Sequence, residues 1–236
     1  GCFSHAVKRR WLESNPLIGV ERPRRGGSDG DIRFLVREEV EVLLRAIPDD
    51  KLASTDRAFY LAATMAGLRQ GELLALRWCD VDWPAGVIRV RRSITRGRIG
   101  TPKSRHGIRA VPLADRLARD LDRHFRQSRY RGDEDLALCH PDSGRPYDAS
   151  KQRKRFKAAL KRAGLREVRV HDLRHTFGTG MAAVGVPMRT LQEMMGHEDI
   201  RTTMADIGFS AYGIQPGFGI AQAATGSLSA SRASFI

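Results

Sequence analysis

The chain has 236 residues, enough for one domain with appended segments, and it carries a formal net charge of +14. A charge of this size attracts polyanions, and nucleic acid is the polyanion whose affinity grows with each backbone phosphate that is neutralised. Three cysteines at unrelated spacings argue against a disulfide framework and favour reduced thiols in a cytoplasmic protein. No apolar run reaches the roughly 18 residues of a membrane span, so a membrane partner is not expected.

Residues 1–30 differ in composition from the rest of the chain. The segment 6–12 has the pattern of the last part of a helix, and a basic stretch around Pro16, Pro23 and Gly26 comes after it. A helix with nothing before it to pack against suggests the end of an earlier domain. We therefore predict that residues 1–30 are the tail of an N-terminal domain and its linker.

Residues 31–206 carry the patterns of the main domain. Apolar residues recur at helical spacing in segments that begin at residue 36, span residues 55–67, 69–78, 114–130, 149–164, 171–184 and 187–195, and begin again at residue 199. Alternating Ile88 and Val90, and later Ile108 and Val111, predict two or three strands of an antiparallel sheet. The expected fold class is therefore mainly α with a small antiparallel β-sheet (α+β).

Charge is distributed unevenly along this domain. Residues 91–131 contain 13 Lys or Arg against three acids, and residues 151–169 contain nine against one. Because a solvated helix face usually mixes both signs, segments of one sign favour a surface that follows phosphates. By contrast, residues 207–236 carry a single charge, Arg232, and are rich in Gly, Ala and Ser, so we expect an irregular or disordered tail.

The stretch "HDLRHTF" at residues 171–177 combines an imidazole and a guanidinium three positions apart. In a helix, His171 and Arg174 share a face, while Leu173 and Phe177 face the core. The pair then presents a proton-transfer group and a permanent cation to one small anion.

Three other segments belong with this pair. "AGLRQGELLALRW" places Arg69 just after a glycine, "TPKSRHGIRAVPL" places Lys103 at an expected hairpin, and "LQEMMGHEDIRTTM" places His197 after a glycine. In this order and at these separations, the segments resemble the catalytic domain of the tyrosine recombinases, the phage integrase family. The resemblance runs from about residue 34 to residue 203, and it identifies residues 1–30 with the tail of a DNA-binding domain.

The resemblance implies a mostly helical catalytic domain with a small sheet, acting on double-stranded DNA as a homotetramer, with no cofactor and no metal. Arg69 and Arg174 would bind the non-bridging oxygens of the phosphate in the transition state, which arginine does without Mg²⁺ because it stays charged. The resemblance implies that Lys103 protonates the leaving oxygen. It also implies that His171 assists proton transfer at the nucleophile and that His197 forms a hydrogen bond to the phosphate.

Two other classes of protein fit part of the sequence. The segment 178–204, with a turn near Gly185, has the spacing of a helix-turn-helix and fits a non-catalytic DNA-binding regulator. A metallohydrolase that uses His171, His175 and His197 is disfavoured because no Glu follows His171 as it does in a zincin.

The expected nucleophile is missing from its place. In the family, a Tyr comes three residues after the second Thr of the "T-T" pair, and here that position holds Asp206. An Asp carboxylate that attacked phosphorus would form an acyl phosphate, which hydrolyses readily and does not hold a DNA strand for religation. The next phenol is Tyr212, six residues later. We expect a chain that keeps the phosphate pocket without forming the covalent link, because its original C-terminal segment has been lost.

Overall fold

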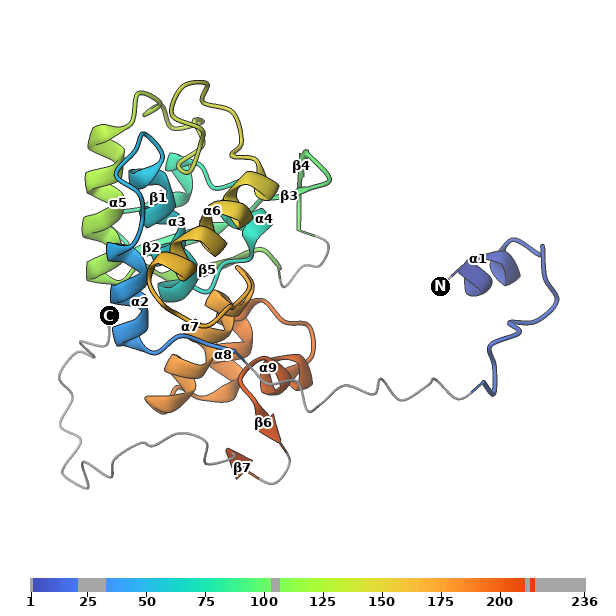
Figure 1. Cartoon of the computed structure of the whole chain (residues 1–236). Helices are drawn as coiled ribbons and strands as arrows, with labels where there is room; N and C mark the ends of the chain where they lie inside the picture. The colour runs from blue at the N-terminus through green and yellow to red at the C-terminus, as the bar shows by residue number, and fades with distance from the viewer. Residues whose placement is uncertain (1, 21–32, 103–106, 211–212, 215–236) are drawn as a thin grey trace. The chain divides into compact units, whose positions relative to one another are not determined.

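The computed structural model describes residues 2–20, 33–102, 107–210 and 213–214 (Figure 1). Residues 209–210 and 213–214 are described by their backbone only. The chain divides into two compact units, Gly1–Asp31 and Ile32–Ile236. Among the described helices, none is both long and apolar enough to cross a bilayer.

The first unit contains helix α1, Cys2–Lys8. This helix begins and ends four residues earlier than the predicted helix over residues 6–12. Its end is set by Arg10, which has a φ of 56° and closes the helix with a hydrogen bond from its N–H to the carbonyl of Val7. A left-handed residue just past the last turn is a common helix terminator.

The second unit is mainly helical, as predicted. Its elements in chain order are α2 (Arg37–Arg45), α3 (Ala53–Met65), α4 (Gln70–Leu73), the 3₁₀ turn η1 (Trp78–Asp80), β1 (Val81–Asp82), β2 (Val87–Val90), β3 (Ser93–Thr95), β4 (Arg98–Gly100), β5 (Arg109–Pro112), α5 (Asp115–Gln127), α6 (Ala149–Arg162), α7 (Asp172–Ala183), α8 (Met188–Met195), α9 (Ile200–Asp206), β6 (Phe209–Ser210) and β7 (Gly213–Ile214).

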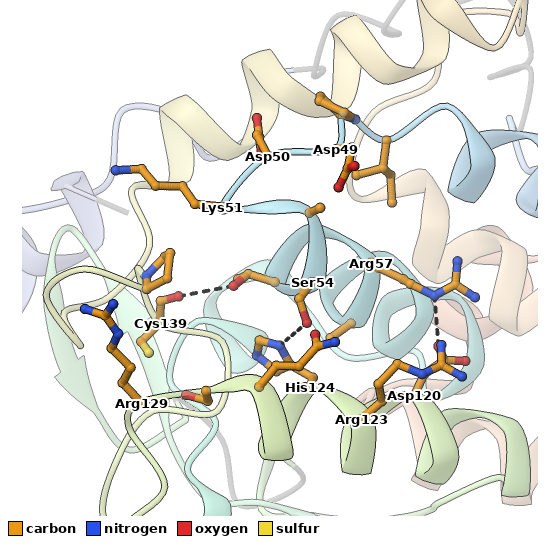
Figure 2. A pocket seen from close by; sticks show the side chains of 18 of the residues that line it. Asp49, Asp50, Lys51, Ser54, Arg57, Asp120, Arg123, His124, Arg129 and Cys139 are labelled. Carbon is orange, nitrogen blue, oxygen red and sulfur yellow. Dashed lines mark hydrogen bonds and ion pairs between the residues drawn. The ribbon is translucent and has the colours of Figure 1, made fainter.

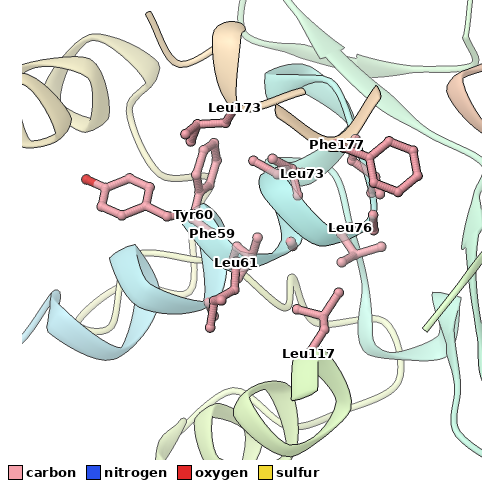
Figure 3. Close-up of a cluster of buried hydrophobic side chains, with 14 of the residues drawn as sticks. Phe59, Tyr60, Leu61, Leu73, Leu76, Leu117, Leu173 and Phe177 are labelled. Atoms are coloured by element: carbon pink, nitrogen blue, oxygen red, sulfur yellow. The ribbon is translucent and has the colours of Figure 1, made fainter. Parts of the chain in front are cut away.

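Helix α3 lies at the centre of the core and packs against both α5 and α7. Its residues from Thr55 to Thr64 are buried on nearly every face, which is the pattern of a helix surrounded by other elements. Figure 3 shows Phe59 and Leu61 of α3 among side chains from α4, α5 and α7. Leu173 and Phe177 are 0% and 5% exposed, so the prediction that this side of residues 171–177 faces the core is confirmed.

The predicted small antiparallel sheet is present, in the strand order β1-β2-β5. Ile88 of β2 pairs with Val81 on one side and with Val111 on the other, and all three are buried. Strands β3 and β4 form a separate hairpin. Ile108, predicted as a strand residue, precedes β5 and is 57% exposed, so that part of the strand prediction is wrong.

The predicted helix over residues 69–78 is also wrong beyond its first turn. Helix α4 ends at Leu73, and the residues after it pair with a distant segment instead. The N–H of Ala137 donates to the carbonyl of Leu76, and the N–H of Trp78 donates to the carbonyl of Asp135. These tertiary hydrogen bonds replace the helical ones that the local apolar spacing predicts.

Strands β6 and β7 form a short antiparallel hairpin within the stretch 207–236 that was predicted to be irregular. Tyr212 and residues 215–236 lie outside the described residues, as do residues 21–32, which include Pro23 and Gly26 of the predicted linker.

Candidate functional site

The turn between α3 and α4 positions Arg69 at the site. Gly67 has a φ of 60°, and a Cβ at this position would lie 2.3 Å from a ring carbon of Phe177, so only glycine fits. Arg69 lies at the N-cap of α4. Its guanidinium donates to Glu72 Oε1 at 2.9 Å and to the carbonyl of Gly196 at 3.0 Å, and its side chain is 38% exposed. This side chain therefore has donors close to solvent.

Arg174 in α7 lies at the centre of the site and is only 1% exposed. Its Nη1 donates to the carbonyl of Gly67 at 2.5 Å, and its Nη2 donates to the carbonyl of Met195 and to His197 Nε2. Its Nε is buried with no partner among the described residues. Burial, followed by the charges of Arg69 and Arg109, lowers the pKa of Arg174 to about 9, so the guanidinium still carries its charge at neutral pH.

His197 comes directly after Gly196, which ends α8 in the left-handed conformation with a φ of 63°. Arginine only donates, so the 2.7 Å contact with Arg174 requires His197 Nε2 to accept, and Nδ1 then donates to Thr203 Oγ1 at 2.9 Å. Burial and the charge of Arg174 lower the pKa of His197 more than neighbouring Asp206 raises it. The imidazole is therefore neutral, with its proton on Nδ1 in this arrangement.

Glu72 joins Arg69 to a second arginine, Arg109 of β5, which lies 37 positions away in the sequence from Glu72. Arg109 donates to both carboxylate oxygens of Glu72, at 3.1 and 2.9 Å, and its side chain is 6% exposed. Burial would raise the pKa of Glu72, but the hydrogen bonds and charge of Arg109 and the charge of Arg69 lower it. Glu72 thus acts as an ionised support between two guanidinium groups.

His171 is the N-cap residue of α7 and is exposed. Its ring lies 4.9 Å from that of His175, edge to face. Partial desolvation, followed by the neighbouring His175 and Arg174, lowers the pKa of His171, so the imidazole is neutral at pH 7. Lys103 lies outside the described residues.

Asp206, the last residue of α9, reaches the same place. Its Oδ2 lies 3.2 Å from His197 Nε2, and its backbone carbonyl lies 2.8 Å from His175 Nδ1. Burial raises the pKa of this carboxyl, but the neighbouring His197, His175 and Arg174 have the larger, lowering effect. An ionised carboxylate is therefore part of the site, beside the guanidinium of Arg174.

The structure brings together four of the five residues singled out in the sequence: Arg69, His171, Arg174 and His197. Their chemistry suits the binding of an oxyanion, since guanidinium groups donate to phosphate in a forked geometry and neutral imidazoles donate or accept single protons. Glu72 balances the charge of Arg109, so Arg69 and Arg174 provide the positive charge that attracts an oxyanion. The carboxylate of Asp206 reduces this attraction.

The comparisons with known proteins decide the family. The model of the phage integrase family matches residues 33–206. The chain belongs to the phage integrase family. A tyrosine recombinase XerC-like protein of Caldanaerobacter subterraneus subsp. tengcongensis is 30% identical over 228 residues, covering 85% of this chain and 57% of the relative. Tyrosine recombinase XerA of Thermococcus kodakarensis is 37% identical over 174 residues, covering 72% of this chain and 56% of the relative.

Among solved structures, the Tn1549 transposon integrase in complex with transposon right end DNA matches with a TM-score of 0.70. That match is 22% identical and covers 89% of this chain and 72% of that chain, so it shows the shared fold. This integrase-family chain spans about half the length of the curated relatives it matches. The family match favours the recombinase interpretation over the helix-turn-helix regulator.

The sequence did not predict the contacts of two further residues at this site, Arg109 and Thr203. Arg109 gave no local signal, because its partner Glu72 is on a different element. Thr203 was part of a quoted motif, yet its contact with His197 needs the turn at Gly196. The metallohydrolase interpretation required His197 as a ligand, but both of its ring nitrogens have other partners.

A pocket of about 580 Å³ elsewhere in the integrase domain contains none of these residues. It lies between α3, α5 and the loop near Cys139 (Figure 2). Ser54 Oγ lies 2.8 Å from His124 Nδ1 there, and His124 Nε2 lies 2.8 Å from the carbonyl of Ala137. This buried hydrogen-bond chain connects α3, α5 and the chain after α5, and it accounts for the position of His124.

Proposed function

We propose that this chain acts on double-stranded DNA as the catalytic domain of a site-specific recombinase, residues 31–206, and holds one backbone phosphate at Arg69, Arg174, His171 and His197. The convergence of these four side chains carries the proposal. Support comes from the relatives named as tyrosine recombinases and from an integrase of the same fold in complex with DNA. Assembly as a homotetramer on DNA, in the cytoplasm, is part of the proposal.

The side-chain chemistry gives each residue its role in the strand cleavage that the family carries out. Attack on a phosphodiester places extra charge on the non-bridging oxygens, and Arg69, which is partly exposed, donates to them. Arg174 adds its charge and an Nε–H that has no partner within the described residues. His171, neutral and exposed, accepts or donates the proton at the attacking oxygen, and His197 donates to the phosphate once its tautomer changes. Lys103 protonates the leaving oxygen.

We further propose that the chain does not form the covalent DNA link of its family, because Asp206 holds the position expected for the tyrosine. The test is a nicked duplex that traps covalent intermediates, followed by a denaturing gel. We expect the parent chain to retard the duplex and to form no denaturant-resistant adduct. An adduct that disappears in Tyr212→Phe would show that Tyr212 is the nucleophile, and one that disappears in Asp206→Asn would show that the carboxylate attacks; either result overturns this part of the proposal. Absence of any retardation overturns DNA binding itself.

DNA binding should depend on the exposed face of α6. This helix buries Gln152, Phe156, Ala159 and Leu160 and exposes its basic residues, except Arg155, which pairs with Asp50 and Asp56. Its first turns adjoin the site, because Gln70, next to Arg69, donates to Gln152 Oε1 at 3.0 Å. The face is therefore placed to extend phosphate binding away from Arg69.

Charge reversal on this face gives the quantitative prediction. The triple variant Lys151→Glu/Lys154→Glu/Lys161→Glu should flatten the slope of log affinity against log salt by about one unit for each phosphate that the variant no longer neutralises. Fluorescence anisotropy on a labelled duplex at several salt concentrations measures this slope.

A matched control changes the net charge by the same amount elsewhere. It reverses Lys51, Arg126 and Arg189, which form surface ion pairs with Asp142, Asp122 and Glu193. We expect this control to flatten the slope less than the α6 variant does. Equal slopes for the two triple variants would mean that net charge alone, and no particular face, governs binding.

A further inference from the structure

Three side chains at the edge of the site form a group of a different kind. His171 and His175 of α7 and Asp206 of α9 each offer one ligand atom, and these atoms all lie within 4.8 Å of one another. Residues four apart on a helix share a face, so the two imidazoles converge on the same point as the carboxylate. None of these three side chains is needed to hold Arg174 in place, since Arg174 contacts Gly67, Met195 and His197.

The hydrogen bonds around His175 leave one ring nitrogen ready to coordinate. Its Nδ1 lies 2.8 Å from the backbone carbonyl of Asp206, and a carbonyl only accepts, so Nδ1 carries the proton and Nε2 keeps its lone pair. A hydrogen bond from the other ring nitrogen to a carbonyl is the usual way in which proteins orient a metal-ligating histidine. Among the described residues, the one ion-pair contact of Nε2 is with Asp172 Oδ1, at 3.9 Å.

The other two ligands lie where an ion can reach them. His171 is exposed, and its ring makes no hydrogen bond among the described residues. The side chain of Asp206 is 16% exposed. Its carboxylate and that of Asp172 offset the charge of Arg174 on this side of the site, which favours a cation here.

We propose that His171, His175 and Asp206 form a binding site for one divalent transition-metal ion of the zinc class. Two imidazoles and one carboxylate suit Zn²⁺, Co²⁺ or Ni²⁺, whereas Mg²⁺ and Ca²⁺ prefer oxygen ligands. Ligand atoms around tetrahedral zinc lie roughly 3.4 Å apart, given metal–ligand distances of about 2.1 Å. The ligand atoms here lie up to 4.8 Å apart, and rotation of the exposed His171 ring brings its nitrogen closer to the other two. The remaining coordination positions take water.

The experiment is a calorimetric titration of the full chain with ZnCl₂ in the absence of DNA, followed by a titration with CoCl₂ monitored by visible absorption. We expect one ion bound per chain, and binding at least about tenfold weaker in His171→Gln and in Asp206→Asn. His171→Gln changes an exposed side chain, so its unfolding temperature in EDTA should match that of the parent. Binding that is unchanged in both variants, or no binding by the parent, overturns the proposal.

Helix α1 provides the matched control, because Cys2 and His5 are both exposed there and lie one turn apart. The double variant Cys2→Ser/His5→Gln should bind Zn²⁺ as the parent does. If this variant loses the ion while His171→Gln keeps it, the ion belongs to α1 and the proposed site is refuted. The proposal does not depend on the proposed function, since no DNA is present: failure to bind DNA and failure to bind metal are measured separately.

Discussion

Replacing Glu72 by Ala should lower the free energy of unfolding by about 3–5 kcal/mol, a large fraction of the total stability of a domain. Glu72 is 3% exposed and accepts hydrogen bonds from the side chains of both Arg69 and Arg109. Arg69 reaches solvent once the carboxylate is gone, but Arg109 is almost completely buried and would keep an unpaired charge. Removing one partner of a buried ion pair costs far more than the pair contributes, because the desolvated charge is left without compensation.

A surface pair gives the comparison for this prediction. Glu167 lies 2.8 Å from Lys157, and both side chains are about two-thirds exposed. Glu167→Gln should therefore change the free energy of unfolding by less than about 1 kcal/mol. Urea unfolding followed by circular dichroism measures both variants. If Glu72→Ala were as mild as Glu167→Gln, Glu72 would not be the support that holds the two arginines.

The helices were predictable where one face must be buried. Leu117 and Leu121 of α5, and Leu173 and Phe177 of α7, repeat at the spacing of a helix, and the structure buries all four. The same spacing failed after Leu73, because the apolar residues there are buried by pairing with residues 135–137, which no local pattern reveals. Periodicity shows that residues are buried; it does not show which element covers them.

The site was predictable to the extent that its residues lie in local motifs. Arg69 lies at the start of a helix, Arg174 lies within one, and His197 follows the glycine that ends one. Short-range sequence patterns indicate positions of this kind. Arg109 lies in β5, and the sequence around it gives no sign of the residue that it pairs with. Its role depends on the pairing of β5 with β2 and on the buried carboxylate of Glu72, which are properties of the folded chain.

The burial of Arg174 could not be predicted from the sequence either. A guanidinium expected to bind phosphate directly is 1% exposed and donates to the carbonyls of Gly67 and Met195. These carbonyls come from the turn before α4 and the end of α8, so the side chain holds three segments together in addition to contributing charge.

The substitution Asp206→Tyr should give this chain the ability to form a covalent DNA adduct, which we expect the parent to lack. Two contacts fix position 206 beside the proposed phosphate site: the carbonyl of Asp206 lies 2.8 Å from His175 Nδ1, and Thr203, one turn earlier, lies 2.9 Å from His197 Nδ1. A tyrosine at this position supplies a phenol near neutral His171, and the substitution also removes an anion that repels phosphate. Attack of the phenol oxygen on phosphorus breaks the bond to the 5′ oxygen of the next nucleotide, which leaves as a hydroxyl, and forms a phosphotyrosyl link that is stable enough to isolate.

The decisive measurement is a denaturing gel of each variant incubated with the nicked duplex. Asp206→Phe, which has the same ring without the hydroxyl, should retard the duplex as Asp206→Tyr does and form no adduct. Adding Arg174→Ala to Asp206→Tyr should slow adduct formation by about 100-fold or more, because donors to the transition-state oxygens contribute that much. If Asp206→Tyr folds and binds DNA yet forms no adduct, position 206 does not face the bound phosphate, and Asp206 is then not the reason for the expected inactivity of the parent.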